Sequence, residues 1–174
     1  MGLFFSETEL TEANTNMDTS GVPVDAYIAL LNTDLFSVGA YEVGIEISDA
    51  SVFILAADGP NGWTNFGQPN NHIVGYATPV PAVDGNAVLG HLSLLYSGAD
   101  TVEMAFGPST PSSFDGQGPG VADGTDPENL VLCTYVTGPD GGGLVATLNG
   151  AGVVFEGGGV ATENHSWSGV KALF

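Results

Sequence analysis

Residues 41–47 read Tyr41-Glu42-Val43-Gly44-Ile45-Glu46-Ile47, an alternation of apolar and polar side chains. Successive side chains of an extended strand point to opposite faces, so the apolar side chains share one face and both glutamates lie on the other. The pattern predicts an antiparallel strand with one face in a core and the other in water.

The same alternation recurs along most of the chain, while helical periodicity is nearly absent. We expect further strands over the ranges 3–5, 22–31, 52–57, 72–78, 87–96, 101–106, 130–137, 144–148 and 152–156. Between the ranges lie clusters of Gly, Pro, Asp and Asn, which favour turns. The sequence therefore predicts an all-β fold, a single domain over residues 1–174 formed by an immunoglobulin-like or jelly-roll β-sandwich of about nine antiparallel strands.

One segment, residues 107–129, is too long for a simple turn and is rich in Gly, Pro, Ser and Asp, so we expect a long loop there. Its carboxylates are candidate ligands for Ca²⁺, which prefers oxygen donors, although a solvated acidic loop is an equally good interpretation. The candidates are Asp115, Asp123, Asp126 and Glu128 in this loop, and Asn14, Asn16 and Asp18 in a second cluster near the N-terminus. The second cluster is not an EF-hand, because Thr19 stands where that loop requires glycine.

The charge balance excludes several functions. The chain holds 20 Asp and Glu residues against one basic residue, Lys171, and its net charge is −19. Nucleic-acid binding requires several cations to displace counterions from phosphates, and an anionic membrane attracts polybasic segments. We therefore expect neither nucleic acid nor anionic membrane as a partner. With a single lysine the chain offers a trypsin-like protease one site, which favours an extracellular or cell-surface location.

No catalytic signature is present in the sequence. His72, His91 and His165 are far apart and form no metal-binding spacing, so we expect them at the surface or satisfied within the core. Cys133 lies in an apolar run, where a buried and unreactive thiol is expected. The sequence predicts that the chain is not an enzyme and requires no cofactor, with Ca²⁺ as the one candidate ion.

Four segments resemble secreted bacterial β-sandwiches of the cohesin-like branch, which includes related carbohydrate-binding modules. They are Val22 to Ile28, Val38 to Glu46, Ile73 to Ala77 and Leu89 to Leu94. The tail at 166–174 is similar to the Trp-Gly-x-Lys-x-Leu-Tyr ending of other secreted bacterial proteins, except that Ser168 separates Trp167 from Gly169. The resemblance implies a nine-stranded sandwich and export, and it implies no catalysis.

Two non-enzymatic functions remain open. The first is a structural protein that assembles with copies of itself into an extracellular fibre, appendage or surface layer, using apolar chain ends that add to a neighbour's sheet. The candidate assembly residues are Leu3, Phe4, Phe5, Val170, Leu173 and Phe174. The alternative is a carbohydrate-binding or cohesin-type protein-binding module. For binding to a polysaccharide, the candidate stacking residues are Trp63, Phe66 and Tyr76.

Overall fold

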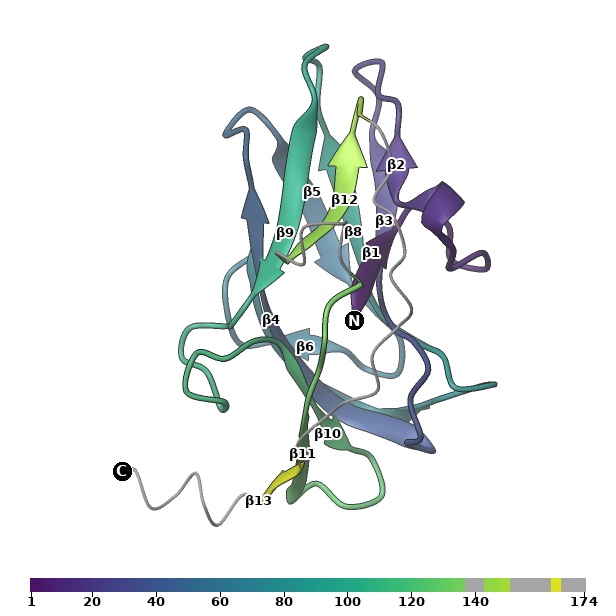
Figure 1. The fold of residues 1–174 in the computed structure, drawn as a ribbon, viewed down its shortest axis with the longest axis vertical. Coiled ribbons are helices and arrows are strands. Elements are labelled where there is room, and N and C mark those ends of the chain that lie inside the picture. The colour runs from purple at the N-terminus through teal and green to yellow at the C-terminus, as the bar shows by residue number, and fades with distance from the viewer. Residues whose placement is uncertain (137–142, 151–163, 167–174) are drawn as a thin grey trace.

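Two β-sheets pack face to face in the structure, a computed structural model that describes residues 1–136, 143–150 and 164–166 (Figure 1). The smaller sheet has the order β1 (Gly2–Phe4), β3 (Val24–Leu30), β8 (Ala87–Leu95) and β5 (Phe53–Asp58). The larger sheet has the order β13 (Asn164–Ser166), β11 (Asn129–Leu132), β10 (Gly120–Asp123), β4 (Ser37–Ile47), β9 (Val102–Gly107), β12 (Leu144–Leu148) and β2 (Asn16–Met17). From β4 it also extends through β7 (Asn71–Pro81) to β6 (Thr64–Asn65). A 3₁₀ turn, Glu12–Asn14, precedes β2.

The β-sandwich prediction is confirmed, but the strand count is higher than expected. Thirteen strands lie within the described ranges, and every pairing is antiparallel except that of β12 with β2, which is parallel. Each expected strand inside those ranges is present, whereas 152–156 lies outside them. The additional strands β2, β6, β10 and β13 have two to four residues each, too few for a visible alternation. Among the described residues, no helix has the length and apolar character needed to cross a bilayer.

Strand β4 organises the larger sheet. One of its edges pairs with β7 from Ser37 to Gly44. The other edge pairs first with β10, opposite Val38 to Glu42, and then with β9, opposite Gly44 to Ile47. Strands β9 and β10 therefore follow one another along the same edge of β4, and the chain leaves this edge only between them, at 108–119.

This arrangement corrects the expectation of one continuous loop at 107–129. The structure divides that segment into the excursion 108–119, strand β10 and a short connection, 124–128. Strand β10 was missed because its sequence, Gly120-Val121-Ala122-Asp123, is short and has one large apolar side chain. Its pairing partners β4 and β11, rather than its own composition, make it a strand.

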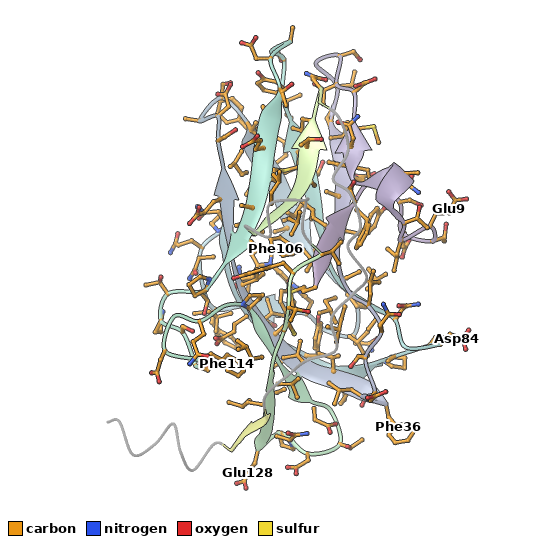
Figure 2. The ribbon with its side chains drawn as sticks, in the orientation of Figure 1. Glu9, Phe36, Asp84, Phe106, Phe114 and Glu128 are labelled. Atoms are coloured by element: carbon orange, nitrogen blue, oxygen red, sulfur yellow. The ribbon has the colours of Figure 1, made fainter. Side chains whose placement is uncertain are left out.

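The predicted alternation of β4 is confirmed on its inner face. Tyr41, Val43 and Ile45 are each at most 3% exposed and belong to the core between the sheets. Among the fully buried side chains of this core are Ile28, Leu89 and Leu94 from the smaller sheet and Met104 and Leu148 from the larger one. Figure 2 shows Phe106 inside the sandwich and Phe36 and Glu128 at its periphery. Glu46 is exposed, but Glu42 is buried although it faces away from this core.

The N-terminal candidates for assembly are part of the protein's own core. Leu3 and Phe4 are fully buried and Phe5 is 9% exposed. Strand β1 pairs with β3, with Leu3 opposite Ile28. These side chains therefore do not form a free end for addition to a neighbouring sheet, because their apolar surface is already buried within the chain. Val170, Leu173 and Phe174 lie outside the described residues.

Replacing Leu3 by alanine tests this role of β1. Loss of a fully buried leucine side chain is expected to lower the free energy of unfolding by about 2–5 kcal/mol. The control is Val22→Ala, at a residue that is 56% exposed, and it should change stability by less than about 0.5 kcal/mol. Urea denaturation at low protein concentration measures both. Equal stability of the two variants would contradict the burial of β1.

Candidate functional site

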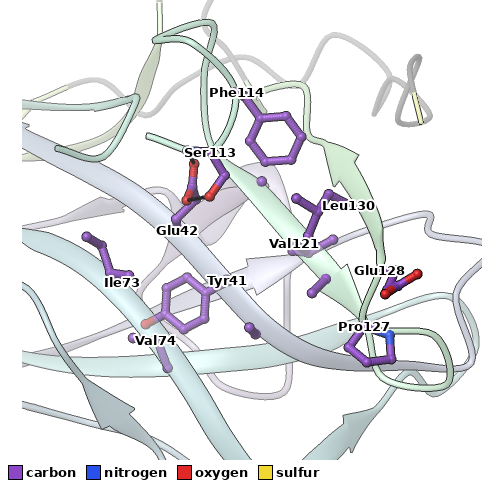
Figure 3. Close-up of a pocket in the computed structure, with 13 residues that line it drawn as sticks. Tyr41, Glu42, Ile73, Val74, Ser113, Phe114, Val121, Pro127, Glu128 and Leu130 are labelled. Atoms are coloured by element: carbon purple, nitrogen blue, oxygen red, sulfur yellow. Dashed lines mark hydrogen bonds between the residues drawn. The ribbon is translucent and has the colours of Figure 1, made fainter. Parts of the chain in front are cut away.

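The outer face of the larger sheet carries an apolar groove of about 480 Å³, which we call the outer groove (Figure 3). Its lining includes Ala40 on β4, Ile73 on β7, Ala122 on β10 and Leu130 on β11, together with Phe114 from the excursion. The outward face of an antiparallel sheet in a sandwich is usually polar. Four neighbouring strands instead present apolar side chains here.

Phe114 forms one wall of the outer groove. It is 4% exposed and forms a small apolar cluster with Ala122 and Leu130, separate from the main core. Its ring packs directly against the backbone of Gly120, where a Cβ atom would lie only 1.9 Å from the ring. Gly120 is therefore required by this close approach, and a larger residue there would push the wall outward.

Glu42 holds the excursion over the sheet. Its carboxylate accepts hydrogen bonds from the Ser113 backbone N–H (2.8 Å), the Ser113 hydroxyl (2.8 Å) and the Ser112 hydroxyl (3.2 Å). These three donors make it favourable to bury a carboxylate that is only 7% exposed. The excursion, and with it Phe114, is thus fixed to β4.

The predicted sugar-binding aromatics do not gather on one surface. Phe66 is 76% exposed and lies over Gly75 of β7. Gly75 is the residue of β7 that is paired with Ala40 of β4. Trp63 and Tyr76 are partly buried and pack against the main core. The Tyr76 hydroxyl donates to the carbonyl of Leu89 at 2.5 Å, and the Trp63 indole N–H donates to Tyr41 at 3.2 Å. The platform expected from three residues is therefore reduced to Phe66, because two of the three direct their polar atoms inward.

A buried chain of hydrogen bonds holds Trp63. Beyond Trp63, the Tyr41 hydroxyl lies 2.7 Å from His72 Nδ1, and His72 Nε2 lies 3.0 Å from the Pro69 carbonyl oxygen. A carbonyl only accepts, so Nε2 carries the proton and Nδ1 accepts from Tyr41. Burial lowers the pKa of His72, only partly opposed by the bond to Pro69, and raises the pKa of Tyr41. The hydrogen-bonded groups of Trp63, Tyr41 and His72 therefore carry no charge. Gly90 leaves room for the Tyr41 hydroxyl, because a Cβ atom there would lie 2.6 Å from it.

His91 forms the two ion pairs found in the part of the chain that the structure describes. Its Nε2 lies 3.0 Å from Asp25 on β3, and its Nδ1 lies 3.1 Å from Asp58 on β5. Partial burial acts to lower the pKa of His91, but the two carboxylates outweigh it and the pKa is raised. The ring of His91 joins three strands of the smaller sheet. Both agree with the expectation that the histidines lie at the surface or are satisfied within the core, since His72 is bonded inside the core and His91 is partly exposed.

The candidate Ca²⁺ residues in the segment 107–129 are not drawn into a common site. Burial acts to raise the pKa of Asp123, but hydrogen bonds from Thr125 and Asn129 outweigh it and the pKa is lowered. Asp126 accepts a bond from the backbone N–H of Glu128. Asp115 has a positive φ of 52° at the excursion's turn. These are local turn contacts of the kind that Asp side chains commonly make.

The N-terminal candidates are likewise dispersed. Asn14 donates to the carbonyl of Glu9, Asn16 accepts from Thr147 and from the backbone N–H of Gly150, and Asp18 is exposed. No group of three His, Cys, Asp or Glu side chains suited to a metal ion occurs within the described ranges. Binding of Ca²⁺ by either cluster stays a prediction.

Cys133 is buried, 5% exposed, with no disulfide among the described residues. Burial raises the pKa of its thiol to about 11, so the thiol is protonated at neutral pH. This confirms the expectation of an unreactive cysteine.

Sequence reasoning missed the outer groove. The available signals were small residues, Ala40 and Ala122, at outward positions of strands, and one aromatic residue, Phe114, within an otherwise polar segment. Neither signal shows which strands are neighbours. The hydrogen bonds from Ser112 and Ser113 to Glu42 span about 70 positions, and they follow only from the pairing of β10 with β4.

The comparisons with known proteins give one structural similarity. No family model matches the chain, and no curated protein matches it. Among solved structures, it is similar to the third cohesin of ScaC from Acetivibrio cellulolyticus, solved in complex with the ScaB dockerin. The identity is 13%, the TM-score is 0.43, and the match covers 64% of this chain and 84% of the cohesin chain. This is a loose cohesin-like resemblance, and the fold assignment rests on the strand pairings themselves.

His72 and His91 should make the stability of the protein depend on pH in opposite directions. His91 has a raised pKa, so its contribution is complete below about pH 6.5 and is lost as the pH rises through the folded value. His72 has a lowered pKa, so its contribution is complete above about pH 6.5 and is lost as the pH falls. Denaturation of wild-type protein, His91→Gln and His72→Gln across this range measures both.

In His91→Gln, the free energy of unfolding should no longer fall as the pH rises above about 6.5. The effect should be below about 1 kcal/mol, because the ion pairs of His91 are partly exposed. His72→Gln should remove the loss on the acid side. NMR titration of the ring protons provides the direct control, with the midpoint of His91 above that of His72. The reverse order would show that the assigned surroundings are wrong.

Replacement of Glu42 by alanine tests its hold on the excursion. Loss of the acceptor leaves the Ser113 N–H without its partner, so amide exchange at Ser113 should accelerate and stability should fall by about 1–3 kcal/mol. Glu46→Ala, at the other outward glutamate of β4, removes the same charge from an exposed site and is the matched control. Hydrogen exchange and urea denaturation measure the two effects. If both variants behave alike, Glu42 does not fix the excursion.

Proposed function

We propose that this chain is a non-enzymatic protein-binding domain whose partner docks on the outer groove. The observation that carries the proposal is the apolar lining of the groove on the solvent side of the larger sheet. Contiguous apolar surface in a concave site is typical of binding surfaces. The exposed ring of Phe66 lies over Gly75, the β7 residue paired with Ala40, and so extends this surface.

Charge indicates the kind of partner. The chain has a net charge of −19, Glu42 lies in the groove, and Glu128 is exposed at its end. A protein segment with apolar side chains and one or more Lys or Arg residues complements this surface, whereas a second equally acidic surface is repelled. We therefore propose a different protein as the partner in the outer groove.

The surroundings of the polar groups support a non-enzymatic role. In the groove, the carboxylate of Glu42 and the hydroxyl of Ser113 are bonded to each other. His72 is buried in the core, and His91 is held by two aspartates on the other sheet. These groups are engaged in holding the fold together. Export from the cell and assembly into a fibre, appendage or surface layer stay predictions from the sequence, as does polysaccharide binding, for which Phe66 alone is left as a stacking residue.

Selection of random peptides displayed on phage tests the proposed function, because it requires no known partner. We expect the intact chain to enrich peptides that combine apolar residues with Lys or Arg. Ile73→Asn, in the groove, and Phe66→Ala, beside it, should each weaken binding of a synthetic enriched peptide by at least about tenfold, as loss of a central contact does at other interfaces.

Val22→Asn is the matched control, since it places the same polar residue at an exposed apolar position outside the groove. Fluorescence polarisation measures the affinities, and circular dichroism confirms that the variants fold. The proposal is wrong if no peptide is enriched, or if Ile73→Asn and Val22→Asn bind the peptide equally well.

A further inference from the structure

A separate surface of the molecule, the edge of the smaller sheet formed by β5, has an unpaired side. Among the described residues β5 pairs only with β8, so its second edge offers backbone N–H and C=O groups to another strand. Natural edge strands usually avoid such pairing with charged residues, proline or a covering segment. Strand β5 reads Phe53-Ile54-Leu55-Ala56-Ala57-Asp58, with its single charge at the end.

The exposure of this strand is unusual for its composition. Phe53 is 60% exposed and Leu55 is 52% exposed. The register with β8 shifts between Ile54 and Ala56, which leaves Leu55 without a partner residue on β8. No neighbouring residue of β8 covers the side chain of Leu55, which is half exposed to solvent.

The surroundings of β5 indicate what can approach it. Residues 50–57 carry no charge, in a chain with 20 acidic residues, so here two copies can meet without placing carboxylates directly opposite one another. Beside the strand lies a groove of about 560 Å³, lined by Ile47, Val52, Phe53 and Ile54 and by the carboxylates of Glu46 and Asp49 at its rim. Phe53 lines this groove and is exposed. In an antiparallel two-fold pairing centred on Leu55, each Phe53 lies opposite Ala57 of the other copy, and each Asp58 lies opposite Val52, so no two carboxylates face each other.

We propose that two copies of this chain associate through antiparallel pairing of β5 with β5. The two smaller sheets then form one sheet in the order β1-β3-β8-β5-β5-β8-β3-β1. A two-fold contact is self-complementary and closes, so the product is a dimer. The contact is weak, because the strand is short and a bulge at Leu55 increases its twist. The site is independent of the outer groove, which lies on the other sheet.

Electrostatics gives the dimer a recognisable signature. Each copy carries a charge of −19, so the two copies repel one another as they meet. Added salt screens this repulsion, so the dimer is favoured by higher salt. Association through opposite charges would weaken under the same conditions.

Sedimentation equilibrium of the full chain, from micromolar to millimolar concentration at low and high NaCl, tests the proposal. The expected result is a monomer–dimer equilibrium with a larger fraction of dimer in high salt. Hydrogen exchange should show protection of the β5 amides that grows with protein concentration. A chain that stays monomeric at all concentrations in high salt overturns the proposal, as does a dimer without protection of β5.

Leu55→Lys and Val83→Lys form a matched pair of variants. Each replaces an exposed apolar residue and adds one positive charge, but Val83, 65% exposed, lies in the turn between β7 and β8. A lysine on an edge strand opposes pairing, so Leu55→Lys should raise the dissociation constant by at least about tenfold while Val83→Lys leaves it unchanged or lowers it. Equal effects of the two variants would show that β5 is not the contact. Neither residue lines the outer groove, so peptide binding by Leu55→Lys, measured in parallel, distinguishes failure of this proposal from failure of the proposed function.

Discussion

The pairing of β4 along both of its edges is the constraint on which the larger sheet depends. Its eleven residues exceed the reach of β9 or β10 alone, and the two strands share one edge in succession while β7 occupies the other. Because a one-residue slip in a strand reverses the face of every side chain, this double pairing holds the inner face of β4 in the core. The same pairing aligns β10 and β11 beside it and so creates the floor of the outer groove.

The scarcity of basic side chains is reflected in how the acidic side chains are bonded. In a chain with one lysine, carboxylates have few basic side chains to pair with, and several described acids instead accept bonds from backbone N–H groups, hydroxyls and amides. Glu42 with Ser112 and Ser113, and Asp123 with Thr125 and Asn129, are two examples. Such bonds are short-range and depend little on salt. They leave the net negative charge in place, and its long-range repulsion is weakened only by added salt. The net charge of the protein therefore acts mainly on the molecules that approach it, and less on the hydrogen bonds within the fold.

The sequence was most informative where a strand is long and one face is buried. The strands β4, β7 and β8 were predicted from alternation, because burial of one face imposes it, although β4 begins four residues before the predicted 41–47 and β7 ends three residues after the predicted 72–78. The strand β10 and the buried Glu42 could not be predicted, because each depends on a partner distant in the chain. The aromatic candidates show the same limit: Trp63 lies in a polar segment, yet Tyr41 supplies a buried acceptor for its indole N–H. Composition located the residues, and only the fold showed which way each one faces.

The excursion 108–119 has a further consequence for how such a domain can change. Both of its ends are pinned to the same edge of β4, so residues can be inserted, deleted or exchanged between them without shifting any strand register. Phe114, which forms a wall of the groove, belongs to this segment. The two sheets can therefore stay the same while the excursion varies. Domains with the same sheets but different excursions would present differently shaped surfaces to their partners.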